Sequence, residues 1–598
     1  MPKKINREDR KSSGSLLNRP RKIVPPHKRK TDSVEASSTS GKKLKSDIAA
    51  DVTEDLSKHY RVIDFLLVFS TVSTLVKCKT CDGKITFKSC RKEGLGFNIK
   101  VSCEKCKQSH YVPSSNRIDA GMYEVNYRFA FVMRILGLGL SGCDKFCGLM
   151  DFSKNFLSKP TYNTYIQKMS QIIQNVANQL FSYAVVEEKE KTSQANNLED
   201  TDELTVSGDG TWKKRGFSSL FGVSSLIGHY SGKVLDICIK SLYCHACKTW
   251  ENKLESQEYE KWHENHVNNQ ECHANHVGPS GNMEVDAIVQ MFKRSTNHGV
   301  KYRNYIGDGD CKTYGGVLSA QPYGEEFTIN KKECIGHVQK RMGTRLRTLV
   351  KTSAVDTETK DGKIVKRKSL GGKGKLTAKM IDKLTVYYGL AIRRNHHSLE
   401  KMRDAIWATF YHYASTDKNP QHEKCPRGDN SWCEWQRAAA ANDVQDFKHS
   451  YTALPQDVIE AIQPIYQDLS KDSLLQRCVG GFTQNNNESL NQLIWKISPK
   501  SISGTSTIVE IAAYVASGVF NEGAFAFLQF MQDMNIGMGP SSHEWARATD
   551  TERIDRANKD AENASKKART ERRQQQKDAL DAADESSVLY GPGIDDSM

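Results

Sequence analysis

The sequence predicts an α/β protein in which a core of strands and helices is interrupted by a long α-helical insertion. A small cysteine-rich module and a helical module precede this core. Three observations lead to the prediction. Residues 201–307 combine several β-prone runs with one helical run. Residues 379–413 repeat apolar side chains at helical spacing, and residues 78–106 hold two Cys-x-x-Cys pairs.

The length and the charge of the chain limit the classes of protein to which it can belong. At 598 residues the chain is too long for one core, so several domains are expected. The net charge of +15 favours a polyanionic partner, and nucleic acid before a membrane surface. The longest apolar stretch, residues 62–76, is short and is broken by Asp64, so it is expected to be a buried core segment. No membrane partner is expected.

The two ends of the chain differ from the rest in composition. Residues 1–56 are rich in Lys, Arg, Ser and Pro and are expected to form a disordered basic arm. Within it, residues 19–30 and 41–45 match nuclear-import signals, with a non-specific basic contact to nucleic acid as the alternative. Residues 546–598 are expected to be a charged helix or a disordered tail. The start has no secretory signal, and a nuclear protein is predicted.

The cysteines point to metal sites rather than disulfides, because the expected compartment is reducing. The first cluster consists of Cys78, Cys81, Cys103 and Cys106, two knuckles separated by β-prone segments. This is the pattern of a zinc ribbon, here residues 57–116, and four protein ligands leave no open position for a substrate. The zinc is therefore expected to be structural, either holding a DNA-facing module or folding a small domain that lacks a core.

Residues 117–200 are predicted to form a helical module. Apolar side chains recur at helical spacing over residues 127–140 and 162–181, with a break between the two stretches. Short helices around a tight turn are consistent with a DNA-binding helix-turn-helix. Ordinary packing explains the pattern as well, because no base-contacting side chains can be identified.

Two aspartates stand at the ends of predicted core strands. The first strand carries Asp209 between Gly208 and Gly210, and the fourth, residues 301–307, is followed at once by Asp308. If the fourth strand lies beside the first, both carboxylates meet at one edge of the sheet. Two carboxylates this close repel each other unless their charge is neutralised. A pair of divalent cations bound between them neutralises it. For Asp209 alone, an Asp-Gly turn is the competing interpretation.

A third carboxylate is predicted on a helix within residues 480–500. Asn485, Asn486 or Asn487 is expected to cap this helix, and Glu488 falls in its first turn. The apolar stripe of the helix consists of Leu490, Leu493, Ile494 and Ile497. Glu488 points away from this stripe and is free to reach the sheet edge. A first-turn Glu that is favoured only by the helix dipole is the alternative.

The succession of "SGDGTWKKRG", "YIGDGDCKTY", "ECIGH" and "NNNESLN" resembles the catalytic domain of Mutator-like element transposases, over roughly residues 60–500. That family is a DDE family with a ribonuclease H-like fold. The resemblance implies that Asp209, Asp308 and Glu488 are catalytic acids that bind Mg²⁺ or Mn²⁺, and that the glycines give DNA close access to Asp209. Asp310 is an alternative ligand. The implied partners are double-stranded DNA, as element terminal repeats and target DNA, and further copies of the chain on that DNA.

The family's Cys-x-x-His element matches Cys334 and His337. A helix starting there places His337, Arg341 and Arg345 on one face, where they are expected to shape the site or contact DNA. Metal binding by Cys334 and His337 is an alternative for which only two ligands are visible. A helix-start motif with a buried thiol is a further explanation.

A second zinc site is predicted within residues 244–283, with Cys244, Cys247 and Cys272 as ligands. The candidates for its fourth ligand are His263, His266, His273 and His276. The resemblance favours His266.

A third cluster consists of His412, His422, Cys425 and Cys433. Its spacing is irregular, so a third zinc site and an ordinary packed loop explain the pattern equally well.

The core is expected in two parts, residues 201–350 and residues 480–545, of which the second carries the third acid. Residues 351–479 between them are too many for a loop and are expected to be the α-helical insertion. Its basic, glycine-rich start, residues 363–377, is a DNA-backbone contact or a solvated loop. The predicted function is DNA cutting and joining by a DDE transposase with two metal ions. A nuclease of the same fold and an inactive transposase-derived zinc DNA-binding protein are the alternatives.

Overall fold

The computed structural model describes residues 43–44, 52–118, 121–214, 218–250, 252, 254–269, 271–309, 311–358, 364–368, 370–429, 431–445, 447–502 and 504–563. Most of the predicted basic arm lies outside the described residues, as do Asp310 and the tail after residue 563. The chain divides into two compact units, of which Thr39–Ala557 contains almost all of the described structure.

The cysteine-rich module is a three-stranded antiparallel sheet. β1 (Ile85–Glu93) pairs with β2 (Gly96–Cys103), and β2 pairs with β3 (Ser109–Pro113). One cysteine pair precedes β1, and the other begins at the last residue of β2, so the pairing of β1 with β2 brings the two knuckles together. The β-prone segments between the knuckles are therefore confirmed as strands.

The apolar segment before this sheet forms an exposed helix, α2 (Phe65–Leu75). Asp64, which interrupts the apolar run, is its N-cap and accepts a hydrogen bond from the Leu67 backbone nitrogen at 2.9 Å. None of the helix residues is buried, and Leu66 and Leu75 are 76% and 77% exposed. The expectation of a buried core segment is wrong, because apolar composition does not by itself supply a surface to pack against.

The predicted helical module consists of α3 (Glu124–Ile135), α4 (Leu140–Leu149) and α5 (Lys159–Asn196). The hydroxyl of Ser158 caps α5 by accepting a hydrogen bond from the Thr161 backbone nitrogen at 3.3 Å, and Asn197 ends the helix in a left-handed conformation. The buried stripe of α5 belongs to the same core cluster as one face of the central sheet. Residues 117–200 and the sheet thus fold together rather than as separate modules.

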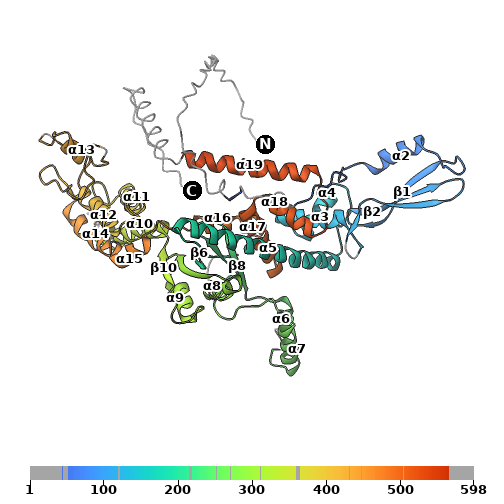
Figure 1. Ribbon diagram of the computed structural model, residues 1–598, viewed down its shortest axis with the longest axis horizontal. Helices are drawn as coiled ribbons and strands as arrows, with labels where there is room; N and C mark the ends of the chain where they lie inside the picture. The colour runs from blue at the N-terminus through green and yellow to red at the C-terminus, as the bar shows by residue number, and fades with distance from the viewer. Residues whose placement is uncertain are drawn as a thin grey trace, which may run out of the picture. The chain divides into compact units, whose positions relative to one another are not determined.

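The core contains a five-stranded mixed sheet (Figure 1). Its strands are β6 (Glu203–Trp212), β7 (Phe221–Gly228), β8 (Val234–Ser241), β9 (Lys301–Gly307) and β10 (Asn330–Glu333). The order across the sheet is β10-β9-β6-β7-β8. β6, β9 and β10 are parallel, whereas β7 is antiparallel to both of its neighbours. The fourth strand lies beside the first, which confirms the strand order on which the prediction for the two aspartates depends.

Helices cover both faces of this sheet (Figure 1). The helices involved besides α5 are α8 (Met283–Arg294), α9 (Cys311–Ala320), α16 (Asn485–Ile497) and α17 (Ser506–Glu522). α8 and α9 share one core cluster with Leu226 of β7, and α5, α16 and α17 share another with Val223. Successive side chains of a strand point to opposite faces, so β7 contributes to both cores.

The predicted helical insertion has a core of its own. Its helices are α11 (Ala378–Arg394), α12 (Leu399–Ala414), α13 (Glu434–Ala440), α14 (Gln456–Leu469) and α15 (Asp472–Cys478). α10 (Ile335–Thr352), expected with the first part of the core, packs Val338, Met342 and Leu346 into this second cluster. β11 (Ala354–Glu358) pairs antiparallel with β12 (Ile364–Lys368), and β12 lies within the segment 363–377 that was expected as a loop or a DNA contact.

The remaining elements are short or terminal. They are β4 (Arg117–Ile118), β5 (Met122–Tyr123), α6 (His245–Thr249), α7 (Gln257–Asn268), α18 (Phe525–Asp533), α19 (Pro540–Asn563) and two 3₁₀ turns, Ser280–Asn282 and Ser295–His298. A helix was one of the two expectations for the charged C-terminal segment, and α19 covers it as far as residue 563. Across the described part of the chain, the helices are too short or too polar to span a lipid bilayer.

The glycines on either side of Asp209 are explained by close packing of β6. A Cβ on Gly208 would lie 2.5 Å from Cε2 of Tyr305, and a Cβ on Gly210 would lie 2.6 Å from Oε2 of Glu284. Since side chains alternate along a strand, Asp209 projects to the other face. The structure thus gives these glycines a packing role on the face opposite the carboxylate.

Gly208→Ala is expected to lower the free energy of unfolding by about 1–3 kcal/mol, because the added methyl group overlaps the buried ring of Tyr305. Chemical denaturation of both proteins measures the difference. Gly148→Ala is the matched control, since a Cβ there meets no atom within 4 Å and alanine is favoured in helix α4. Equal destabilisation by both substitutions would contradict the packing argument.

Candidate functional site

Asp209 lies on β6, and Asp308 directly follows β9, the parallel strand beside it. β6 and β9 are paired with Ser207 opposite Ile306. Two residues farther along each strand stand Asp209 and Asp308, at the carboxyl end of β9. β6 continues past this point to Trp212, so Asp209 lies within its strand and not at its end as expected. An Asp-Gly turn at Asp209 is thereby excluded.

The Asp209 carboxylate is partly buried and held by α16. The side-chain amide of Asn491 donates a hydrogen bond to Asp209 Oδ2 at 2.8 Å. Burial, together with the neighbouring Asp308 carboxylate, raises the pKa of Asp209 to about 6 against the opposing effect of this hydrogen bond. Two ionised carboxylates at this place therefore repel each other, and a bound cation would offset the repulsion.

Side chains of α16 and of its N-cap residue donate hydrogen bonds to β6. The donors and acceptors are Gln484 Nε2 to Gly208 O (2.7 Å), Asn487 Nδ2 to Ser207 O (3.2 Å), Asn491 Nδ2 to Asp209 Oδ2 (2.8 Å) and Trp495 Nε1 to Thr211 Oγ1 (2.8 Å). These positions recur at the helical period, so they form one face of the helix. Together they fix both the rotation of α16 and its position along the strand.

Glu488 stands in the first turn of α16 and on the side that carries these donors. It follows Gln484 by four residues and precedes Asn491 by three, which places the three side chains on one side of the helix. Glu488 is exposed, whereas Leu490 is fully buried. Gln484 occupies the N-cap position without a side-chain capping hydrogen bond, so the expectation of an asparagine cap is wrong.

The three acids come from three separate elements: β6, the residue after β9, and α16. Their carboxylate oxygens are the hard ligands that Mg²⁺ and Mn²⁺ prefer. Within the described residues, the groups whose ligand atoms all lie within 4.8 Å of one another are three Cys/His clusters, and the acids do not form such a group. The donor chemistry fits a divalent cation, and the assignment of Glu488 stays a prediction.

Cys334 and His337 connect the start of the insertion to β6. Cys334 is the buried N-cap of α10, and His337 lies in the first turn. His337 Nδ1 is 3.0 Å from Oε1 of Gln484, whose amide binds the Gly208 carbonyl. A hydrogen bond with the Cys334 thiol raises the pKa of His337, while burial opposes the rise. Among the described residues no third metal ligand joins this pair, which favours the site-shaping role over metal binding.

The two predicted arginines of α10 are both paired with acids. Arg341 lies 2.7 Å from Glu333, a buried carboxylate at the end of β10, and Arg345 forms an ion pair with Asp468 of α14. The Arg341 guanidinium also fills the space beside the loop that carries Asp308. Arg341 is thus placed to shape this loop, and Arg345 to hold two helices of the insertion together.

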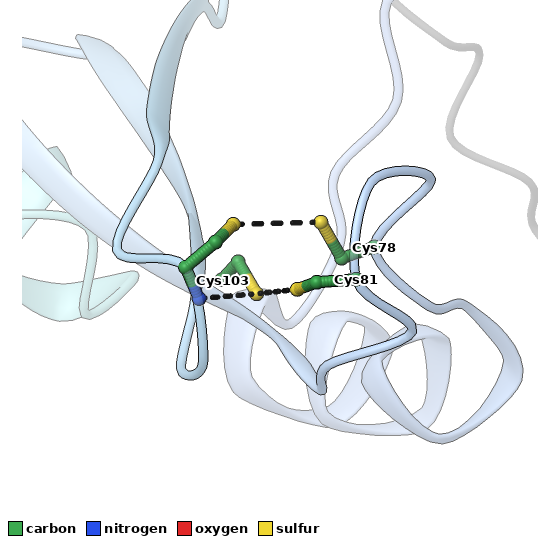
Figure 2. Close-up of side chains that lie close together, drawn as sticks. Cys78, Cys81 and Cys103 are labelled. Atoms are coloured by element: carbon green, nitrogen blue, oxygen red, sulfur yellow. Dashed lines mark hydrogen bonds between the residues drawn. The ribbon is translucent and has the colours of Figure 1, made fainter.

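The first cysteine cluster assembles as its spacing predicts. Figure 2 shows the thiols of Cys78, Cys81 and Cys103 facing one another between two loops. The Sγ atoms are 3.7 Å apart for Cys78 and Cys106 and 3.4 Å apart for Cys81 and Cys103. All four sulfurs lie within 4.8 Å of one another, and four thiolates at this separation fit a tetrahedral zinc ion.

Both knuckles of this cluster repeat one backbone turn. The residue after the second cysteine, Asp82 or Lys107, has a positive φ of 53° or 62°. Its nitrogen donates to the carbonyl of the first cysteine, at 3.0 Å for Cys78 and 3.2 Å for Cys103. A Cβ on Gly83 would lie 2.8 Å from the Cys103 sulfur, so only glycine leaves room for the thiols there.

The second cluster is completed by one histidine. Cys244 Sγ lies 3.3 Å from Nε2 of His266, and Cys247 Sγ lies 3.6 Å from Cys272 Sγ. The ligand atoms of these four residues all lie within 4.8 Å of one another. His276 Nδ1 instead lies 2.7 Å from Asp286 Oδ2. The structure thus selects His266, which α7 carries in its last turn.

The third cluster also comes together. His412, His422, Cys425 and Cys433 are all buried, and their ligand atoms lie within 4.8 Å of one another.

A family model for Mutator-like transposases matches residues 59–433, which is more than half of the chain. The chain belongs to the Mutator-like transposase family. Searches among curated proteins and solved structures gave no match.

The matched part of the transposase contains all three Cys/His clusters together with Asp209 and Asp308. It ends before α16, so the family match does not extend to Glu488. The prediction that Glu488 is a third acid therefore depends on the contacts between α16 and β6.

Three side chains around the candidate site were not anticipated from the sequence: Gln484, Asn491 and Glu333. Gln484 and Asn491 could have been found, because polar side chains at 484, 487, 491 and 495 recur at helical spacing beside the apolar stripe. Glu333 gave no such signal. Its burial depends on Arg341 and Arg477, which approach it from two different helices at 2.7 Å and 3.4 Å.

Proposed function

We propose that this protein is a DDE-type DNA transposase that cuts and joins DNA ends with two divalent metal ions. The observation that carries the proposal is the position of Asp209 on β6 beside Asp308, which directly follows the neighbouring strand β9. Glu488 is proposed as the third acid because it lies on the side of α16 whose side chains contact β6. Membership of the Mutator-like transposase family supports DNA as the substrate. The order of the sheet, with the fourth strand beside the first, supports a ribonuclease H-like core.

In this proposal Asp209, Asp308 and Glu488 hold Mg²⁺ or Mn²⁺. Two such ions, when bound, activate water or a DNA 3′-hydroxyl for in-line attack and stabilise the leaving oxygen. Asn491 fixes the direction of the Asp209 carboxylate, and Gln484 fixes the strand segment on which that carboxylate stands. The same side chains then serve both cleavage and strand transfer.

The other parts of the proposal concern metals, partners and location. The clusters at Cys78–Cys106 and Cys244–Cys272 hold structural zinc, because four protein ligands leave no place for a substrate. The DNA partners are element terminal repeats and target DNA, on which copies of the chain assemble. The basic segments near the start of the chain direct the protein to the nucleus.

Purified protein incubated with DNA that carries candidate element ends tests the proposal. We expect strand breaks at those ends and joined products, both of which require added Mg²⁺ or Mn²⁺. Cleavage without joining would indicate a nuclease. Binding without cleavage under all metal conditions would indicate a transposase-derived DNA-binding protein.

Asn491→Ala is expected to raise the Mg²⁺ concentration that gives half-maximal cleavage by about tenfold, because a hydrogen bond to a charged carboxylate contributes about 1.5–3 kcal/mol. A Mg²⁺ titration of the cleavage rate measures this shift. Asn486→Ala, on the same helix and away from the Asp209 contact, is the control and should titrate like the wild type. An unchanged midpoint for Asn491→Ala would show that this contact does not position a metal ligand.

A further inference from the structure

The insertion contains a long segment whose folded structure is not explained by the apolar surface that it buries. Residues 415–451 link α12 to the approach of α14, and α13 is their only α-helix among the described positions. The separate apolar cluster formed there contains Ala408, Cys425 and Cys433, with Trp435 packed against it. Three small side chains bury too little surface to order so many residues. Another source of stability is needed.

The two cysteines of that cluster are also two members of the third Cys/His group. His422 Nδ1 lies 3.4 Å from Cys433 Sγ and 3.8 Å from Cys425 Sγ, and His412 Nδ1 lies 4.0 Å from Cys425 Sγ. His412 is in the last turn of α12, whereas the other three belong to the segment. Two sulfurs and two imidazole nitrogens at these separations make the donor set of a tetrahedral structural zinc.

A second observation points to a metal at His422. The other ring nitrogen of His422, Nε2, lies 2.9 Å from Nε2 of His449, and His449 Nδ1 lies 2.5 Å from Asp417. The Asp417 carboxylate only accepts, so His449 Nδ1 carries the proton. In the tautomer in which His449 Nε2 accepts from His422 Nε2–H, the lone pair of His422 Nδ1 is directed at the two sulfurs.

A histidine that binds a metal through Nδ1 needs this tautomer, with the proton on Nε2 and the lone pair on Nδ1. Histidines that bind metals commonly donate the opposite N–H to a carboxylate, a carbonyl or water, which fixes the ring orientation. Here the carboxylate acts through a second histidine. The backbone nitrogen of His449 also donates to Asp417, at 2.9 Å, and the His449 side chain is 5% exposed, so the relay is itself held in place.

We propose that His412, His422, Cys425 and Cys433 form a third zinc site, that His449 and Asp417 support it from outside, and that this zinc fastens residues 415–451 to α12. His449 is a positioning residue, because it acts through His422. The site is structural and independent of the chemistry at Asp209.

Zinc content of the purified full-length protein tests the ligand set. Cys433→Ser should contain one zinc per chain fewer than the wild type, and limited proteolysis should cleave it within residues 415–451, where the wild type resists cleavage. Cys478→Ala, which removes another buried cysteine of the insertion, is the matched control and should keep the wild-type zinc content. Equal zinc in Cys433→Ser and the wild type would overturn the proposal.

His449→Ala tests the outer support without removing a ligand, and decides the question if Cys433→Ser does not fold. The affinity of this site for zinc should fall by about 10–100-fold, so that a competing chelator removes one zinc at a correspondingly lower concentration than in the wild type. His397→Ala, an exposed histidine before α12, should release zinc like the wild type. Zinc release from His449→Ala that equals the wild type would contradict the relay. Cobalt substitution adds a signature, because loss of this site removes the spectrum of a two-sulfur centre and keeps those of the four- and three-sulfur centres.

Discussion

Asp209→Asn, Asp308→Asn and Glu488→Gln are each expected to reduce DNA cleavage and joining by about 10³-fold or more. An amide in place of a carboxylate offers a divalent cation a weaker, uncharged ligand, and stabilisation of charge in the transition state is usually the largest single contribution to such catalysis. Single-turnover assays on DNA with candidate element ends measure both steps.

Folding and DNA binding should survive these substitutions. The pKa of Asp209 is raised to about 6 by burial and by Asp308, so removal of the charge relieves repulsion and leaves no cavity. Thermal unfolding of Asp209→Asn should therefore be no easier than that of the wild type. Asp200→Asn, an exposed acid before β6 whose side chain is 78% exposed, is the control and should cleave normally.

Of the three substitutions, Glu488→Gln is the most direct test of the third acid. A Glu488→Gln protein that cuts and joins DNA at the wild-type rate would show that the third acid lies elsewhere. Because α16 would still bind β6 through Gln484 and Asn491, such a result would remove Glu488 and leave the pairing of Asp209 with Asp308 intact.

Cys103→Ser is expected to unfold the sheet of β1, β2 and β3 and to release one zinc per chain. Few residues of these strands are buried, and every residue of β3 is exposed, so apolar burial contributes little to the stability of the sheet. Structural zinc contributes about 10–16 kcal/mol of apparent binding free energy in small zinc-dependent peptides. Hydrogen exchange over residues 77–113 together with elemental analysis measures both effects.

Cys90→Ser is the matched control for this module. Cys90 lies on β1 outside the four-sulfur cluster, so its substitution should change neither zinc content nor exchange protection. The five-stranded sheet should stay protected in both variants, because its two cores do not include the module's strands. A Cys103→Ser protein with wild-type zinc content and protection would refute the assignment of these ligands.

Much of the site follows from short-range features of the sequence. The Cys-x-x-Cys spacing fixes which thiols are able to share a metal, and the alternation of β-prone and helical runs fixes which strand carries Asp209 and which strand precedes Asp308. The apolar stripe of α16 likewise predicts that Leu490 and Ile494 are buried, as they are. The local pattern did not reveal that α2 stays exposed, because exposure depends on the surfaces that the rest of the chain supplies.

By itself, then, the sequence determined the four-cysteine cluster, the order of the core elements along the chain and the strands to which Asp209 and Asp308 belong or are joined, since spacing and periodicity are properties of neighbouring residues. Only the tertiary structure decided that His266 completes the second cluster, that α5 belongs to the core of the sheet, and that Asn491 binds Asp209. The last contact joins residues 282 positions apart. Such contacts form only where packed helices and strands bring distant surfaces together, and no local pattern specifies which surfaces those are.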